Sequence, residues 1–170
     1  MSAMFLAREY IFITRFKTGR YTMAKAEEKL SPELVESLQG EKIVSLVTID
    51  AETNEPDLSV ISWLLAHEDG KTIKFAVGHN ANTAKNIEEN PDVILGVTGA
   101  GSCFSVKGKG SVSDVISKTM KYRVVTVVVD SVKDVIFYGG KITAEAQYEK
   151  TYDPKLAEKL DEEVYSLLKE

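Results

Sequence analysis

Residues 75–93 read FAVGHNANTAKNIEENPDV, and the order of residue types in this stretch decides the fold. The apolar residues at its beginning end a strand predicted over residues 72–77. A polar loop then leads to a short helix, which we expect to be capped by Asn82 and to run to Glu89. Asn90 and Pro91 end the helix because proline cannot continue it. The stretch therefore predicts a strand, a glycine-containing loop, a helix and a further strand.

The loop and the helix start also have the features of an anion site. The first N–H groups of a helix have no partner within the helix, and the helix dipole favours negative charge there. Thr83 adds a hydroxyl, Lys85 a positive charge, and Asn82 and Asn86 amide donors. A capped surface helix that binds nothing shows similar residues. The residues by themselves leave both alternatives open.

Most of the remaining chain predicts β-strands. β-Branched and apolar residues form short runs separated by turn signals such as Asp69-Gly70, which favours a hairpin. In the run 57–67, Leu58, Val60, Ser62 and Leu64 are expected on one face. The predicted strands cover residues 43–49, 57–67, 72–77, 93–97, 102–115, 122–129, 135–138 and 142–148.

The run 102–115 alternates most clearly. Phe104, Val106, Gly108, Gly110 and Val112 are expected on one face, and Cys103, Ser105, Lys107 and Lys109 on the other. Two glycines on the inner face indicate a tightly curved sheet in which a side chain would not fit.

Helices are predicted near both ends of this β-rich region. One begins after Ser31-Pro32, and the other spans residues 153–169 with Asp153-Pro154 at its start. The fold class predicted from this order is mainly β, a β-barrel of six to seven strands with flanking helices.

The bulk properties are those of one globular domain. The chain has 170 residues, 44% of them hydrophobic, and a net charge of -5. A negative net charge argues against a nucleic-acid-binding surface. The single cysteine, Cys103, excludes an internal disulfide and suits a reducing compartment, so we expect a cytoplasmic protein. No apolar run approaches the roughly 20 residues of a membrane span.

The first 22 residues have a different character. Apolar residues there are interrupted by charges such as Arg8 and Arg15, which does not fit a signal peptide. We expect Met23 to be the natural start, residues 1–22 to be an upstream extension, and residues 23–170 to form a single domain. The alternative is that residues 1–22 form an ordered arm packed on a partner.

The stretch 75–93 resembles the corresponding segment of the FMN-binding split-barrel family, which is related to pyridoxamine 5'-phosphate oxidase. Thr83 falls where family members often have lysine, and Lys85 where arginine or lysine is common. Asn86-Ile87 matches the family's Asn-Leu pair, and Asn90-Pro91 matches the entry to the next strand. The resemblance covers about residues 30–115, with Gly108-Lys109-Gly110 similar to the family's Gly-X-Gly strand.

Two features depart from the oxidases of this family. Residues 57–60, Asp-Leu-Ser-Val, lack the arginine that usually contacts the flavin phosphate. The chain ends in Leu-Leu-Lys-Glu rather than in an arginine-rich, proline-ending carboxyl terminus. These departures argue against a role in pyridoxine metabolism.

The resemblance implies FMN as the cofactor and a set of residues that would contact it. These are Ser59, Ile61, Trp63, Phe75, Ala76, Val77, Gly78, His79, Asn82, Thr83, Lys85 and Asn86. Trp63 either covers the flavin ring or fills the barrel wall. His79 is a phosphate donor, a haem ligand as in related haem-handling barrels, or a solvated loop residue. We assign no catalytic side chain and no metal ligand.

The function implied is that of an FMN-dependent oxidoreductase, which transfers hydride between a reduced nicotinamide or other small substrate and the flavin. The alternative is a non-catalytic protein that binds flavin or haem in a stress response. Flavin sites of this fold usually lie between two subunits, so a homodimer is expected. Cys103, Ser105 and Lys107 lie on the outward strand face that would meet the partner.

Overall fold

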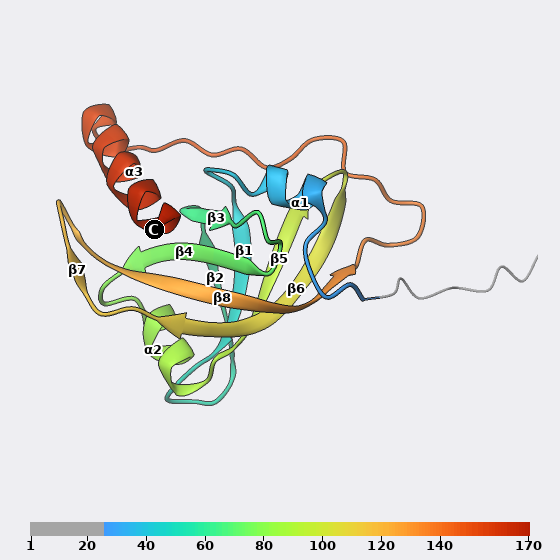
Figure 1. The fold of residues 1–170 in the computed structure, drawn as a ribbon, viewed down its shortest axis with the longest axis horizontal. Coiled ribbons are helices and arrows are strands. Elements are labelled where there is room, and N and C mark those ends of the chain that lie inside the picture. Colours follow the sequence, from blue (N-terminus) through green and yellow to red (C-terminus); the bar gives the residue numbers. More distant parts are fainter. Residues whose placement is uncertain (1–25) are drawn as a thin grey trace, which may run out of the picture.

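A computed structural model describes residues 26–170 of the protein. The expected start at Met23 and the expected extension over residues 1–22 therefore lie outside the described residues. The described part is one curled antiparallel sheet with three helices (Figure 1). This confirms the predicted fold class, a mainly β half-barrel with flanking helices.

The sheet contains eight strands in the described residues, in the order β2-β1-β5-β6-β8-β4-β3, with β7 paired to β8. The sequence predicts a barrel of six to seven strands drawn from eight strand-like runs, and several of these runs differ from the observed strands in their bounds. The strands are β1 (Val44–Ile49), β2 (Pro56–Ile61), β3 (Leu64–Ala66), β4 (Thr72–Gly78), β5 (Asp92–Gly99), β6 (Ser102–Val112), β7 (Ile116–Ser117) and β8 (Lys121–Asp134). The helices are α1 (Pro32–Ser37), α2 (Asn82–Glu89) and α3 (Pro154–Lys169).

The single strand predicted over residues 57–67 is wrong. The chain bends at Ser62 and Trp63, where the N–H of Leu64 donates to the carbonyl oxygen of Ser62. Ile61 and Leu64 are both buried, so the alternation of faces shifts by one residue at the bend. As a result β2 pairs with β1 and β3 pairs with β4, at opposite ends of the strand order.

The carboxyl-terminal strands also differ from the prediction. Instead of two strands over 122–129 and 135–138, β8 runs without interruption from Lys121 to Asp134. The polar residues 130 and 131 lie within β8 at a β-bulge: the consecutive β6 residues Lys107 and Gly108 pair with Ser131 and Val129, so Asp130 is the extra residue. Residues 135–153 contain no helix or strand, so the strand predicted over 142–148 is wrong as well.

The main core fills the inside of the curled sheet. The alternation predicted for β6 is confirmed, with Val106, Gly108 and Gly110 buried and Lys107 and Lys109 exposed. A Cβ added at Gly110 would lie 2.7 Å from Cγ2 of Ile87, on α2. Glycine at this position therefore lets α2 pack directly on the sheet.

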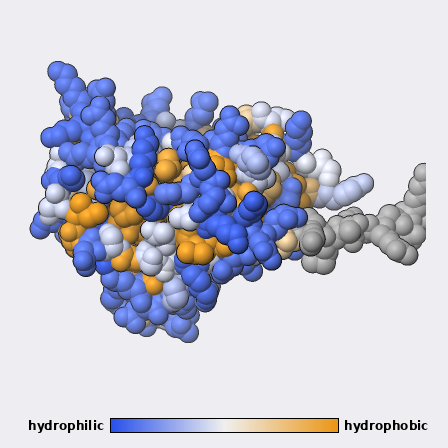
Figure 2. Space-filling model, in the orientation of Figure 1, coloured by the Kyte–Doolittle hydropathy of each residue, from blue (hydrophilic) through white to orange (hydrophobic). Residues whose placement is uncertain are grey.

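A second, separate hydrophobic cluster lies beneath α3. Leu160, Val164, Leu167 and Leu168 of this helix pack on Ala76, Tyr122 and Val124 of the strands β4 and β8. Figure 1 shows α3 and α2 at the same end of the molecule, with the end of β4 between them. Figure 2 shows apolar residues that reach the surface on this side of the molecule.

No helix within residues 26–170 is long and apolar enough to cross a membrane.

Candidate functional site

The start of α2 is the only helix start in the described residues without a side-chain cap. Ser31 accepts a hydrogen bond from the N–H of Leu34 at the start of α1, and Asp153 does the same for Leu156 in α3. The cap residue of α2 is Ala81, not the predicted Asn82, which is the first residue of the helix. The methyl group of Ala81 offers no acceptor, so the first N–H groups of α2 have no side-chain partner at the cap.

Two hydroxyl groups meet beside this helix start. Oγ1 of Thr83 lies 3.4 Å from Oγ of Ser59, on β2. Thr83 is buried, with only 7% of its surface exposed. The contact brings together two residues that the sequence assigns to the same site.

Asn86 has a different position from the one predicted. Its side chain is 1% exposed and points away from the helix start, into the turn between β1 and β2. Its Nδ2 donates to Oγ1 of Thr48 at 3.0 Å and to Oδ2 of Asp57 at 3.1 Å, and its Oδ1 accepts from the N–H of Ala51 at 3.0 Å. The amide is thus fully used in holding α2 to the β1–β2 turn.

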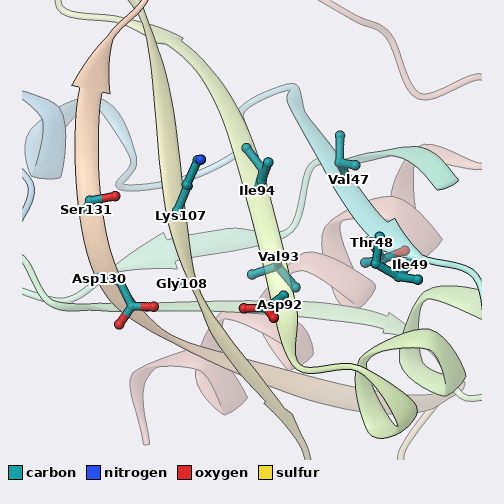
Figure 3. Close-up of a pocket in the computed structure, with 10 residues that line it drawn as sticks. All are labelled: Val47, Thr48, Ile49, Asp92, Val93, Ile94, Lys107, Gly108, Asp130 and Ser131. Carbon is teal, nitrogen blue, oxygen red and sulfur yellow. The ribbon is translucent and has the colours of Figure 1, made fainter. Parts of the chain in front are cut away.

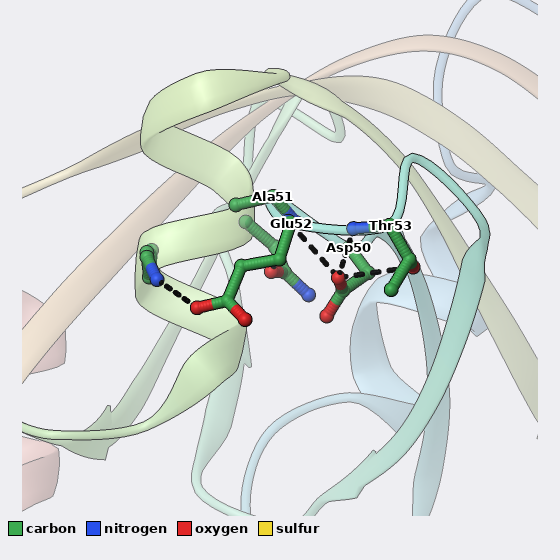
Figure 4. Close-up of polar contacts among 6 residues, drawn as sticks. Asp50, Ala51, Glu52 and Thr53 are labelled. Atoms are coloured by element: carbon green, nitrogen blue, oxygen red, sulfur yellow. Dashed lines mark hydrogen bonds and ion pairs between the residues drawn. The ribbon is translucent and has the colours of Figure 1, made fainter.

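Lys85 supplies positive charge in the first turn of α2 but has a partner. Its Nζ lies 2.7 Å from Oε1 of Glu52, in the β1–β2 turn (Figure 4). The hydrogen bond and the charge of Glu52 raise the pKa of Lys85. The turn is itself ordered by Asp50, whose carboxylate accepts from the N–H groups of Glu52 and Thr53. Both Lys85 and Glu52 are exposed, so solvent screens their attraction.

The end of β4 leads directly to the helix start. Gly78 is exposed, and a Cβ added there would meet no atom within 4 Å, so the space above this residue is open. His79 is half-buried, and its backbone N–H donates to the carbonyl oxygen of Lys121. The helix start therefore borders an open surface on β4.

The other predicted cofactor-contacting residues fall into two groups. Ile61, Phe75 and Val77 belong to the main core and are at most 9% exposed. Trp63 and Ala76 lie beneath α3. Trp63 packs edge-on against Tyr122, with ring centroids 5.9 Å apart, and its Nε1 donates to Oδ1 of Asp161 at 2.8 Å. Of the predicted set, the structure brings Ser59, Gly78, His79, Asn82, Thr83 and Lys85 together around the helix start.

Asp161 of α3 is paired, and its side chain is only 21% exposed. Lys150 forms ion pairs with both Asp161 and Glu41, and Tyr148 donates to Oε2 of Glu41 at 2.8 Å. Burial alone would raise the pKa of Asp161, but hydrogen bonds from Lys150 and Trp63 lower it. These partners lie in segments with no common sequence pattern, so no signal in the sequence could have joined them.

A hollow of about 330 Å³ lies on the outer face of the sheet. Val47, Ile49 and Ile94 form its apolar side, and Figure 3 shows Asp92 and Asp130 on either side of the strand that carries Gly108. The hollow contains none of the residues around the start of α2. Next to it, Leu58 and Val60 of β2 expose 67% and 63% of their surface.

Within residues 26–170, no group of three or more His, Cys, Asp or Glu side chains could hold a metal ion.

The fold is that of a known protein family. A family model described as pyridoxamine 5'-phosphate oxidase matches residues 30–133, which is more than half of the chain. The protein therefore belongs to the pyridoxamine 5'-phosphate oxidase family. No curated protein shows significant sequence similarity to it.

Solved structures agree on the fold. One, described as a candidate pyridoxamine 5'-phosphate oxidase from Lactobacillus delbrueckii, has a TM-score of 0.54 and 17% identity, and covers 65% of this chain and 98% of its own. HupZ from Group A Streptococcus has a TM-score of 0.53 and 14% identity, and covers 68% of this chain and 99% of its own. At these identities the likeness shows the fold alone.

Proposed function

We propose that the protein binds FMN at the start of α2 and acts as a flavin-dependent oxidoreductase. The observation that carries this proposal is the uncapped helix start beside the hydroxyls of Ser59 and Thr83, in a member of a family named for a phosphate-bearing substrate. A phosphate would supply the acceptor that Ala81 does not provide.

The residues present fit a phosphate better than they fit a neutral group. The N–H groups of Asn82 and Thr83 and the two hydroxyls are all donors, and Lys85 adds a charge if it leaves Glu52. Gly78 leaves room beside them for the rest of a ligand. When bound, the flavin supplies the hydride-transfer chemistry, and the protein supplies position and electrostatics.

Two features predict modest affinity. β2 carries Asp57 and Leu58 rather than an arginine, so no fixed guanidinium faces the phosphate from this strand. Lys85 must also give up the carboxylate of Glu52 in order to bind the phosphate. Its net contribution to the binding free energy is therefore only the difference between two charge-assisted interactions. We therefore expect FMN to be partly lost during purification.

A homodimer fits the outer face of the sheet. Leu58 and Val60 are large exposed apolar residues on a strand at the end of the sheet, next to the hollow that Lys107 also lines. Contiguous exposed apolar surface of this kind favours association with a partner. Light scattering at micromolar concentration should give twice the 18.8 kDa chain mass, and Val60→Lys should reduce it to one chain mass.

We keep a cytoplasmic location as a prediction from the single Cys103.

A non-catalytic flavin-binding or haem-binding protein is the second candidate. The observation that favours it is the cover that α3 provides over Trp63, because a covered ring site suits retention better than turnover. The rate of NADPH oxidation, measured with an artificial electron acceptor and added FMN, distinguishes the oxidoreductase from the non-catalytic binding protein. Sustained turnover supports the oxidoreductase, and its absence despite FMN binding supports the binding protein. Titration with haem, followed by its absorbance, tests the haem alternative, with His79→Ala as the matched variant.

The cofactor site is tested by comparing FMN with riboflavin, which lacks the phosphate. Lys85→Ala should weaken FMN binding by roughly tenfold, as expected for a charge-assisted hydrogen bond. Thr83→Val should weaken it several-fold, by about 1 kcal/mol. Neither change should affect riboflavin. Flavin fluorescence titration measures both ligands, and equal affinity of the unaltered protein for FMN and riboflavin would remove the phosphate argument.

A further inference from the structure

The surface beneath α3 continues the open surface beside α2. Ala76 and Gly78 lie on the same face of β4, since side chains two residues apart in a strand share a face. The space above Gly78 is open, whereas Ala76 is covered by α3. Tyr122 lies opposite Gly78 in the register of β4 and β8. A path along β4 therefore leads from the start of α2 to an aromatic face made of Trp63, Ala76 and Tyr122.

α3 is attached to the barrel without being part of its main core. The hydrophobic cluster inside the barrel contains no residue of α3, and the helix contributes only to the second cluster. Residues 135–153, which join β8 to α3, contain no helix or strand. Removal of α3 from its seat would leave the main core unchanged, and the joining segment is long enough to permit movement.

The docked helix leaves polar groups unsatisfied. The hydroxyls of Tyr122 and Tyr165 are buried and have no hydrogen-bond partner among the described residues. Burial raises the pKa of Tyr122 to about 12. Unpaired buried hydroxyls disfavour the docked position of α3, and a ligand with polar ring atoms could pair with them.

Besides the hydrogen bond from Nε1 of Trp63 to Asp161, two polar contacts hold α3 in its seat. Lys150, on the joining segment, pairs with Asp161 of α3 and with Glu41. At the β7–β8 turn, Oγ1 of Thr119 donates to Oε1 of Glu163 at 2.6 Å. The contact between Thr119 and Glu163 is exposed, whereas the side chains of Lys150 and Asp161 are only 17% and 21% exposed.

We propose that α3 is a displaceable cover over the face formed by Trp63, Ala76 and Tyr122, and that lifting it opens this face to the ring system of the bound ligand. The part that concerns the ligand rests on the proposed FMN site. In this arrangement the phosphate binds at the start of α2 and the ring follows β4 to the aromatic face. The apparent affinity of the protein for the ligand is then the affinity of the lifted form multiplied by the fraction of molecules in which the helix is lifted.

Trp63 is the single tryptophan of the chain, so its fluorescence reports directly on the cover. Lys150→Met removes one polar contact, and Thr119→Val removes the other at an independent place. Lys155→Met is the matched control for Lys150→Met, because Lys155 is exposed on α3 and the change of charge is the same. Acrylamide quenching of Trp63 should increase in both contact variants but not in the control. Hydrogen exchange over residues 154–169 should increase while that of β8 stays unchanged.

FMN titration of the same proteins completes the test. The apparent affinity should rise by about threefold or more in Lys150→Met and Thr119→Val, because a larger open fraction binds more tightly. Unchanged quenching and exchange in both variants would overturn the cover. Raised quenching with unchanged or weaker FMN binding would overturn the claim that the helix covers the ring site. If quenching increased but neither the unaltered protein nor any variant bound FMN, the claim that α3 is a displaceable cover would be supported and the proposed function would be wrong.

Discussion

The two longer helices of this protein are attached to the sheet in opposite ways. α2 packs into the main core through Ala84 and Ile87 and is held by the buried amide of Asn86, but its start is left without a cap. α3 packs on the outside through a separate cluster, and its start is closed by Asp153. The helix that packs into the main core, α2, is thus the one whose first N–H groups have no side-chain cap. This places a rigid group of hydrogen-bond donors at the edge of an open surface.

The largest expected effect concerns the seat of α2. Ile87 is 2% exposed and lies against Gly110, so Ile87→Ala should leave a cavity and lower the free energy of unfolding by about 3 kcal/mol. Leu156→Ala on α3 is the control, because this side chain is 40% exposed and should cost much less. Urea denaturation measures both. Equal losses in the free energy of unfolding for the two variants would contradict the claim that α2 is attached to the sheet through buried side chains of the main core.

The second prediction concerns the buried amide. Asn86→Ala removes the partner of Thr48, Asp57 and the N–H of Ala51, and should lower the free energy of unfolding by about 2 kcal/mol. Asn82→Ala, on the exposed side of the same helix, should change it by less than about 0.5 kcal/mol. If the two variants unfold alike in urea, Asn86 does not hold α2 to the turn.

The third prediction concerns the closed helix start. Asp153 accepts from the N–H of Leu156 at 2.8 Å, so Asp153→Ala should cost about 1 kcal/mol of stability. The loss should appear as faster hydrogen exchange in α3, with α2 and the strands unaffected. If hydrogen exchange became faster to the same extent across the whole protein, α3 would unfold only together with the whole domain. That result would contradict the view that the cluster beneath α3 is separate from the main core.

Local patterns in the sequence predicted the parts of the fold that depend on local physics. The strand–loop–helix order of residues 72–89, the alternation of β6 and the cap of α3 were all readable, because each follows from spacing or capping within a few residues. The bend at Ser62 and Trp63 was not, because it depends on which edge of the sheet each half joins. The uninterrupted run of β8 past residue 130 includes a β-bulge at Asp130, which depends on pairing with β6, a strand formed by a different part of the sequence.

The candidate site was predicted in the same uneven way. Thr83 and Ser59, which both belong to the set that the resemblance implies, lie in contact, and their contact with a cofactor stays a prediction. The partner of Lys85 in Glu52, the inward amide of Asn86 and the contact of Trp63 with Asp161 could not be predicted, because each joins residues more than 28 positions apart in the chain. Periodicity and motifs carry no information about such pairs.

The most direct test of the account is Ala81→Asp. An aspartate at this cap position supplies the acceptor that α2 lacks, so the ligand-free protein should gain about 1 kcal/mol in its free energy of unfolding. The same carboxylate would occupy the phosphate position and repel it, so FMN binding should fall by at least about tenfold while riboflavin binding stays unchanged. A variant that gains stability and keeps its FMN affinity would show that the start of α2 is not the phosphate site.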